Sequence, residues 1–428
     1  MWWEEEQHLE VRNNQLYIGG QEAAVLAGKY GTPLYVYNGN KILKNFRRLK
    51  DALFRHTAKL RLHYAVKANA HIQILKLLGE QGAFADCVSP IECELALKAG
   101  LPLERILFTG TSVSNLDLEK LVELGVKVNM DSISQLRRLA AISTDPEISI
   151  RWNPGEGSGA GLHSHTITAG KYIKFGVPEH MVLDAFREAK DLGFKVIGFH
   201  QHIGSGWLGE DVDVFLGSVK KTLELAADAE KIVGHSLDFI DFGGGPGIRY
   251  SEDQTPFPIE EYAEGLVVAV REGGFEGDVA IEPGRYIVGE SGVLLLEINT
   301  VEDKNLPIIG VDGGFNTLVR PSFYEAYHEM VLCSDVNGEK KRSFMVAGNL
   351  CESSDVFNTS KKELRPLPEP NEGDILALLC AGAYGFEMAS AYNGRPLPSQ
   401  VLILDGNDHL ITERSGIDSI VSNQRMPV

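Results

Sequence analysis

Eight short runs rich in β-branched and aromatic residues alternate with helix-like stretches between residue 60 and about residue 285, and this alternation limits the fold most. The runs cover 61–69, 84–89, 105–110, 126–132, 148–154, 194–204, 236–245 and 279–285. Intervening segments such as HIQILKLLGEQG carry apolar residues at i, i+3, i+4 and i+7, which is the helical period. Strands that alternate with helices predict βαβ units and a parallel sheet. Eight such units predict a closed (β/α)8 TIM-type barrel.

The two ends of the chain have a different pattern. LEVRNNQLYI (9–18) predicts a hairpin around Asn13-Asn14, followed by a short helix that stops near Gly31 and Pro33. Beyond residue 288, strands such as VLLLEINTVED and SQVLILDG follow with few helices between them. We therefore expect an α/β barrel domain at 38–287 and a mostly C-terminal, antiparallel β-domain made of 1–37 and 288–428. Two domains are also natural for 428 residues.

Composition and charge narrow the function classes. The 41 basic and 59 acidic side chains give a net charge of −18, which disfavours a nucleic-acid partner. No apolar run reaches the ~18 residues of a membrane span, and the acidic start MWWEEEQHLE is unlike a targeting signal. The five cysteines are scattered without C-x-x-C spacing, which predicts a reducing, cytoplasmic location and no metal site.

Polar residues follow the predicted strands where each one ends. They are Lys67, Asp86, Thr109, Asp131, Asn153, His202, Gly243, Gly244, Gly245, Glu282 and Arg285. Active sites of (β/α)8 barrels are built at the carboxyl ends of the strands. Polar turns begin at strand ends in any case, but a lysine, three glycines and an arginine together favour a site.

Two of these motifs suggest a carbonyl compound that carries a phosphate. Lys67 ends the strand HYAVKAN, and burial there would lower the pKa of its amine and make it a nucleophile toward a carbonyl. The run DFGGGPG (241–247) exposes backbone N–H groups that can hold a phosphate, and it follows the seventh strand, where such barrels bind phosphate. A surface lysine and a flexible turn are the alternatives when each motif is taken alone.

Two further motifs offer groups for an aromatic ring. In HIGS, the flat imidazole of His202 can stack on a ring and the Ser205 hydroxyl can donate to a phosphate. In IEPGR, Glu282 next to a pyridine nitrogen would keep that ring protonated, while Arg285 lies three residues further on. A structural histidine and an ordinary salt bridge are the alternatives.

Seven motifs occur in one order along the chain: YAVKAN, HIGS, DFGGGPG, EPGR, RPSFYEAYH, CESSD and GAYGFEMAS. In this order and spacing the sequence resembles the alanine-racemase-fold decarboxylases that use pyridoxal 5′-phosphate (PLP), and most closely the diaminopimelate decarboxylase family. The resemblance runs from about Tyr35 to about Leu404. It implies that PLP is the cofactor and that a small amino acid is the substrate.

The resemblance also implies residue roles at the cofactor. Lys67 would hold PLP as a Schiff base, His202 would stack on its ring and Glu282 would face the ring nitrogen. Other cofactor-binding residues would be Asp86, Ser205, Gly243, Gly244, Gly245, Gly284, Arg285 and Tyr384.

At the substrate, the same resemblance implies that Cys351 is the acid that returns a proton after CO2 leaves. Glu352 would receive the distal amine, and Arg285, Arg320, Tyr324 and Tyr384 would surround the distal carboxylate and the cofactor. The family also implies a homodimer in which the CES segment comes from the neighbouring subunit.

Arginines that pair with a distal carboxylate favour meso-2,6-diaminopimelate as substrate, with L-lysine and CO2 as products, which is the last step of lysine biosynthesis. One alternative is a related decarboxylase that acts on D-ornithine, D-lysine or a carboxylated polyamine. A racemase is disfavoured because CESSD and RPSFYEAYH match the decarboxylases. A non-catalytic PLP-binding homologue is disfavoured because Lys67 and Cys351 are both present.

Overall fold

The computed structural model describes residues 1–428 except 5, 7, 156, 158–166, 359–362 and 427–428. The chain forms two compact units. The β unit consists of 1–44, 249–254 and 287–428, and the barrel unit consists of 45–248 and 255–286. Helix α2 (Gly39–Phe54) carries the chain from the first unit into the second.

Eight parallel strands close the barrel unit into a ring, which confirms the predicted TIM-type barrel. Each strand pairs with the next, and β8 pairs with β9 while β13 pairs with β5. Each of the eight predicted runs overlaps one of them: β5 (Leu60–Ala65), β6 (Phe84–Cys87), β7 (Ile106–Phe108), β8 (Lys127–Met130), β9 (Ile148–Asn153), β11 (Val196–Gln201), β12 (Phe239–Asp241) and β13 (Asp278–Ile281). A two-residue strand, β10 (Val177–Pro178), adds to β9.

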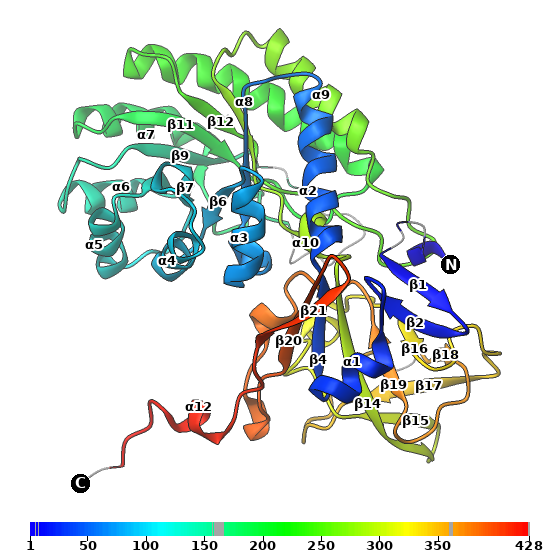
Figure 1. Cartoon of the computed structure of the whole chain (residues 1–428). Coiled ribbons are helices and arrows are strands. Elements are labelled where there is room, and N and C mark those ends of the chain that lie inside the picture. Colours follow the sequence, from blue (N-terminus) through cyan, green and yellow to red (C-terminus); the bar gives the residue numbers. More distant parts are fainter. Residues whose placement is uncertain (5, 7, 156, 158–166, 359–362, 427–428) are drawn as a thin grey trace. The chain divides into compact units, whose positions relative to one another are not determined.

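Helices surround these strands in Figure 1: α3 (Ile72–Glu80), α4 (Pro90–Lys98), α5 (Asn115–Leu124), α6 (Ile133–Ala140), α7 (Glu179–Asp191), α8 (Val212–Val233) and α9 (Ile259–Glu272). Local sequence sets their ends. Helix α5 begins with a capping box between Ser114 and Asp117 and ends at Gly125 in the left-handed conformation. Helix α4 begins with Ser89 as its cap and Pro90 in its first turn. A short helix, α10 (Arg285–Val288), follows β13.

The β unit contains a three-stranded sheet and a larger nine-stranded sheet. The small sheet is β1 (Leu9–Arg12), β2 (Gln15–Ile18) and β3 (Gln21–Glu22), and its predicted hairpin turns at Asn13 and Asn14, both with positive φ. The large sheet holds β4 (Leu34–Asn38), β14 (Gly292–Asp303), β15 (Pro307–Val311), β16 (Met330–Leu332), β17 (Arg342–Ala347), β18 (Arg365–Leu367), β19 (Ile375–Leu378), β20 (Ser399–Leu404) and β21 (Asn407–Thr412). Helices α1 (Ala23–Tyr30), α11 (Arg320–Tyr324) and α12 (Ile417–Val421) complete the unit.

The larger sheet is mixed rather than purely antiparallel. Strand β4 pairs in parallel with β20, and β15 pairs in parallel with β17, while the other pairs are antiparallel. Parallel neighbours need a long connection, and the paired strands β4 and β20 lie near opposite ends of the sequence. Alternating hydrophobic patterns do not reveal strand direction, so the sequence predicted the strands but not these two orientations.

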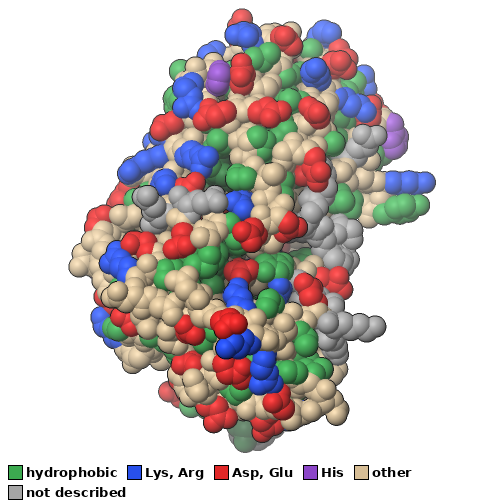
Figure 2. Space-filling model, turned by 90° about the vertical axis from the view of Figure 1, so that its right-hand side faces the viewer, with side chains coloured by type: hydrophobic (Ala, Val, Ile, Leu, Met, Phe, Trp, Pro, Cys, Tyr) green, Lys and Arg blue, Asp and Glu red, His purple; other side chains and the backbone are tan. Residues whose placement is uncertain are grey.

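Charged side chains of both signs are interspersed over the face of the molecule shown in Figure 2, in keeping with the 41 basic and 59 acidic residues. Within the described part of the chain, no helix combines the length and the apolar character that crossing a bilayer requires.

Candidate active site

Lys67 lies directly after β5, in a single helical turn (Val66–Ala68) at the carboxyl end of the strand. Its Nζ is 3.4 Å from Oδ2 of Asp86, which lies near the carboxyl end of the neighbouring strand β6. The Asp86 side chain is fully buried, whereas that of Lys67 is 33% exposed. Burial, and next the charge of Glu282, raises the pKa of Asp86, while Lys67 opposes that rise. The amine is thus accessible while a buried carboxyl group fixes its direction.

The glycine turn after β12 is packed so tightly that side chains cannot be added. A Cβ on Gly243 would lie 2.5 Å from the carbonyl oxygen of Gln201, and a Cβ on Gly245 would lie 2.3 Å from the Trp207 ring. Both glycines have positive φ, at +75° and +142°. The Gly243 N–H donates to Oδ1 of Asp241 at 2.8 Å. Within the described residues, the buried N–H groups of Gly244 and Gly245 have no protein acceptor.

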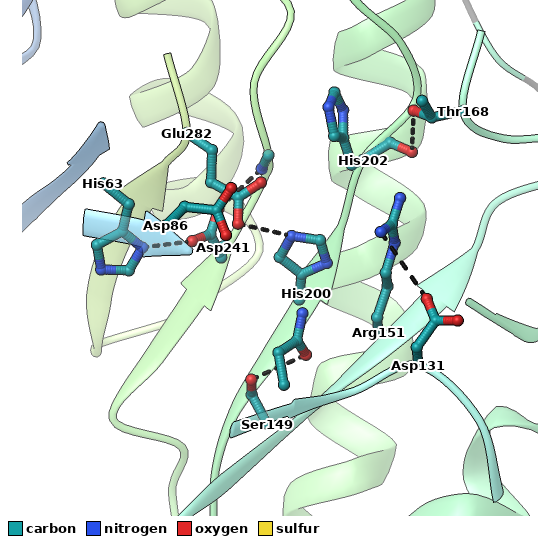
Figure 3. A network of polar contacts seen from close by, with 12 residues as sticks. His63, Asp86, Asp131, Ser149, Arg151, Thr168, His200, His202, Asp241 and Glu282 are labelled. Atoms are coloured by element: carbon teal, nitrogen blue, oxygen red, sulfur yellow. Dashed lines mark hydrogen bonds and ion pairs between the residues drawn. The ribbon is translucent and has the colours of Figure 1, made fainter. Parts of the chain in front are cut away.

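A buried carboxylate–histidine network adjoins this turn through Asp241, which accepts the Gly243 N–H. Figure 3 shows the side chains of the network. His200 Nε2 is 3.0 Å from Oε1 of Glu282, and all of the His200 side chain is buried. On the other side, His63 Nδ1 is 2.7 Å from Oδ2 of Asp241. Ligand atoms of His200, Asp241 and Glu282 lie within 4.8 Å of one another. Such spacing also suits a metal ion, but hydrogen bonds to His63, Gly243 and one another already engage these groups.

His202 follows β11, and its Nδ1 accepts the Gly204 N–H at 3.4 Å. Burial, and next the charge of Lys67, holds the pKa of His202 well below its usual range, so the ring is neutral. Its backbone carbonyl accepts from the Thr168 hydroxyl at 3.0 Å, as Figure 3 shows. A neutral, fixed imidazole can stack on a flat ring without adding charge to it.

Arg285 begins α10 and is 4% exposed. Its Nε and Nη2 both lie 3.3 Å from the Ser205 hydroxyl oxygen. The adjacent Gly284 packs against the turn that holds Lys67, because a Cβ there would lie 2.9 Å from Cβ of Ala68. A buried guanidinium, a hydroxyl and two backbone N–H groups form a donor set that suits a phosphate.

In the β unit, Arg320 begins α11 and is 3% exposed. Its Nε donates to Nε2 of His328 at 3.2 Å, and its Nη2 donates to the Tyr250 hydroxyl at 3.3 Å. His328 carries its own proton on Nδ1 because that atom lies 2.8 Å from the Leu379 carbonyl oxygen. These contacts fix the plane of the guanidinium.

Cys351 and Glu352 lie in an exposed turn at 351–354. Of the five cysteines, Cys351 alone is exposed. Tyr324, at the end of α11, is half-buried, as is Tyr384, which has a φ of +56°. The barrel unit therefore brings together Lys67, Asp86, His202, Ser205, the three glycines, Glu282, Gly284 and Arg285, and the β unit holds the other five candidates.

Four buried polar side chains of the barrel were missed from the sequence: His63, His200 and Asp241 of the carboxylate–histidine network, and Arg151. Arg151 is 6% exposed and lies 3.8 Å from Asp131 Oδ1, with its guanidinium 4.6 Å from the centre of the Phe175 ring. A signal was present, since His63, Arg151 and His200 lie within apolar strands and Asp241 ends one. A buried polar side chain must find a hydrogen-bonding partner, and in this barrel the partner comes from another strand of the closed sheet, as for His63 in β5 and Asp241 in β12.

Comparisons with known proteins assign the family. A family model described as "Pyridoxal-dependent decarboxylase, pyridoxal binding domain" matches residues 39–289. A diaminopimelate decarboxylase from Methanothermobacter thermautotrophicus is 41% identical over 418 residues, covering 96% of each chain. The chain belongs to the diaminopimelate decarboxylase family.

Solved structures of family members have the same fold. The diaminopimelate decarboxylase of M. jannaschii is 30% identical, with a TM-score of 0.89 over 98% of both chains. The Helicobacter pylori enzyme, in an I148L form complexed with L-lysine, is 34% identical, with a TM-score of 0.84 over 93% of this chain and 98% of that one. Membership of the family makes this chain a PLP-dependent amino-acid decarboxylase.

The residues present fit PLP. The N–H groups of Gly244 and Gly245, both buried residues, have no acceptor among the described residues, and the Gly245 carbonyl accepts the N–H of Gly206, the residue after Ser205. With Ser205 and Arg285, which contact each other, these donors suit a phosphate. Asp86 Oδ1 is buried without a hydrogen-bond partner in the described structure. Lys67 offers an accessible amine for the aldehyde, and Glu282 offers a carboxylate for the pyridine nitrogen. Each polar part of the cofactor has a complementary group in the barrel unit.

Proposed function

We propose that this protein decarboxylates meso-2,6-diaminopimelate to L-lysine and CO2. The observation that carries the proposal is the pairing of Lys67 with buried Asp86 in a barrel that also holds a glycine cradle and Glu282, in a chain 41% identical to a diaminopimelate decarboxylase. The similar H. pylori enzyme was crystallised with L-lysine, the expected product.

Lys67 attaches the cofactor covalently, and Gly244, Gly245, Ser205 and Arg285 hold its phosphate. PLP held there would supply an electron sink for the charge left at the substrate Cα when CO2 departs. Glu282 keeps the proton on the ring nitrogen, and His200 orients Glu282 through the 3.0 Å contact. His202 stacks on the ring as a neutral group, while Asp86 directs the lysine amine.

The β unit supplies the groups for the substrate. Cys351 returns a proton to Cα, for which a thiol is suited because thiols are mostly protonated at neutral pH and still release a proton readily. Glu352 receives the distal amine, and Arg320 pairs with the distal carboxylate, with Tyr324 and Tyr384 beside them. His328 and Tyr250 hold the Arg320 guanidinium in a fixed plane, so it can present a fork to a carboxylate.

We also propose a homodimer in which the turn 351–354 enters the partner's site. Support comes from the exposure of all four residues of this turn, because a proton donor in open solvent would neither exclude water nor be held against a substrate. The five free cysteines support a reducing, cytoplasmic location.

The test combines a substrate panel with mass spectrometry. We expect CO2 release from meso-diaminopimelate to exceed that from D-ornithine, D-lysine and carboxylated polyamines. After borohydride reduction of the holoprotein, peptide mapping should place the cofactor on Lys67. A preference for a substrate without a distal carboxylate would refute meso-diaminopimelate as the substrate. A cofactor attached to another residue would refute the assignment of Lys67.

Mixing two inactive variants tests the shared site. Lys67→Ala and Cys351→Ala remove groups that we assign to opposite subunits, so subunit exchange should create heterodimers with one intact site. If subunits mix at random, about a quarter of wild-type activity should return. Absence of recovery in a mixture shown by mass to contain heterodimers would place both groups in one subunit.

A further inference from the structure

A buried carboxylate lies at the base of the exposed turn that carries Cys351. Residues 351–354 are all exposed, whereas Asp355, the next residue, is 4% exposed. A charged side chain is seldom buried to this extent unless hydrogen bonds replace its water. The contacts of Asp355 therefore indicate what the burial achieves.

Both carboxylate oxygens of Asp355 accept backbone N–H groups from separate segments. Oδ2 accepts from Leu350, the residue before Cys351, at 2.8 Å. Oδ1 accepts from Phe315 at 2.7 Å. The main chain of Asp355 adds two bonds, because its carbonyl accepts the Gly348 N–H at 3.0 Å and its own N–H donates to the Glu352 carbonyl at 3.1 Å. The carboxylate thus ties both ends of the turn to the loop before α11.

The surrounding backbone is shaped to admit this carboxylate. A Cβ on Gly314 would lie 2.6 Å from Asp355 Oδ1, and a Cβ on Gly348 would lie 2.3 Å from Asp355 Oδ2. Real Cβ atoms do not approach oxygen so closely, so only glycine fits at either position without movement. Two glycines from different segments therefore accommodate one side chain.

A second set of contacts holds the outer side of the turn. The Cys351 N–H donates to Oδ1 of Asn393 at 2.8 Å, and Arg395 Nη2 donates to the Asn349 carbonyl at 3.0 Å. The Cys351 backbone is therefore fixed from Asn393 on one side and, through Leu350, from Asp355 on the other. Such a turn can be exposed and still present its thiol in one position.

We infer that Asp355 is a positioning residue for catalysis: it holds the turn 351–354 so that the Cys351 thiol meets the substrate carbon in the correct place. The inference rests on the proposed role of Cys351 as the proton donor. It predicts an effect on turnover in particular, because misplacing a reacting group by about 1 Å can lower the rate about 100-fold. Cofactor binding should not change, because we assign it to residues outside the turn 351–354, chiefly those of the barrel unit.

The experiment compares Asp355→Ala and Asp355→Asn with a matched control, Asp374→Asn. Asp374 is also in the β unit, where it accepts the Asn371 N–H at 2.7 Å and the Ser334 hydroxyl at 3.2 Å, but it lies outside the turn and its anchors. For each variant, kcat, KM, the PLP dissociation constant and the thermal midpoint are measured on the holoenzyme.

We expect kcat of Asp355→Ala to fall at least about 10-fold with KM within about twofold of wild type and unchanged PLP affinity. The kcat of Asp355→Asn should fall less, because the amide oxygen of asparagine still accepts one N–H. The control should lose stability only. If Asp355→Ala does not fold, Gly348→Ala gives the same test, since its Cβ would displace the carboxylate.

Two outcomes would overturn the inference. One is a folded, PLP-loaded Asp355→Ala with wild-type kcat, and the other is an equal loss of kcat in the Asp374→Asn control. Cys351→Ala separates this failure from failure of the proposed function. If Cys351→Ala retains full turnover, the proton donor itself is wrong and the positioning role falls with it. If Cys351→Ala is inactive while both Asp355 variants are normal, only the positioning role is refuted.

Discussion

Replacing Gly244 by alanine should separate cofactor binding from folding. Gly244 lies between the left-handed Gly243 and Gly245, and a Cβ on it would lie 2.4 Å from the Glu282 carbonyl oxygen. That obstacle is backbone rather than a flexible side chain, so relief requires a shift of the glycine turn, of Glu282, or of both. Either shift displaces a group that we assign to PLP.

The size of the effect follows from the overlap. Separating the two atoms to about 3.0 Å requires a movement of about 0.6 Å, and overpacking of this kind usually costs about 1–3 kcal/mol. If relief of the strain disrupts the PLP-bound arrangement, the dissociation constant of PLP rises about 5- to 150-fold, at about 1.4 kcal/mol per factor of ten. Once saturated with PLP, the variant should regain much of its turnover.

The assay is a titration of the apoprotein with PLP followed by absorbance, alongside activity at increasing PLP. Gly217→Ala is the matched control, because Gly217 lies in α8 of the same unit with nothing within 4 Å of its added Cβ. Alanine in a helix interior should leave PLP affinity unchanged and slightly stabilise the protein. Wild-type PLP affinity in a folded Gly244→Ala variant would refute the assignment of this turn to the phosphate.

Two further predictions concern other parts of the molecule. In Arg320→Lys, the lysine cannot reproduce the bonds to His328 and Tyr250 and also present a fork to a carboxylate. The kcat/KM for diaminopimelate should therefore fall about 100-fold, with PLP affinity unchanged. An unchanged kcat/KM would mean that the distal carboxylate is bound elsewhere. Burial, and next the charge of Lys41, lowers the pKa of His8 to about 3. Below about pH 6.5 the unfolded chain protonates at His8 and the folded chain does not, so His8 should remove about 2 kcal/mol of stability between pH 7 and pH 5. Denaturant unfolding at both pH values should show a correspondingly smaller loss in His8→Gln, and an equal loss would exclude His8 as the cause.

The barrel could be predicted because its signal is local and repeated. Each strand is a short apolar run that ends in a polar residue, and each helix has the 3.6-residue period, so the order of elements alone implied closure. Lys67, Glu282 and the glycine run stood out because lysine, glutamate and three consecutive glycines are unusual at the ends of apolar strands. The structure places these residues at the same end of the barrel strands.

The carboxylate–histidine network could not be predicted in the same way. His63 and Asp241 are 178 positions apart, and their contact exists because β5 and β12 both flank β13 in the closed sheet. The role of Asp355 was equally hidden, since its partners Leu350 and Phe315 contribute only backbone N–H groups. Backbone donors leave no trace in the sequence, although the glycines that make room for the carboxylate do.

Two histidines lie close together in the chain, His200 within β11 and His202 just after it. We assign them different roles at the cofactor, His200 at Glu282 and His202 at the ring. His200 Nε2 lies 3.0 Å from Oε1 of Glu282, while its Nδ1 is buried without a partner in the described structure. Glu282 then accepts a hydrogen bond from His200 and is left with a carboxylate oxygen for the ring nitrogen. His202 is kept neutral by burial and by Lys67. With His202 neutral, Glu282 is the carboxylate that we propose holds a proton on the pyridine nitrogen, and replacing Glu282 should impair turnover more than replacing either histidine.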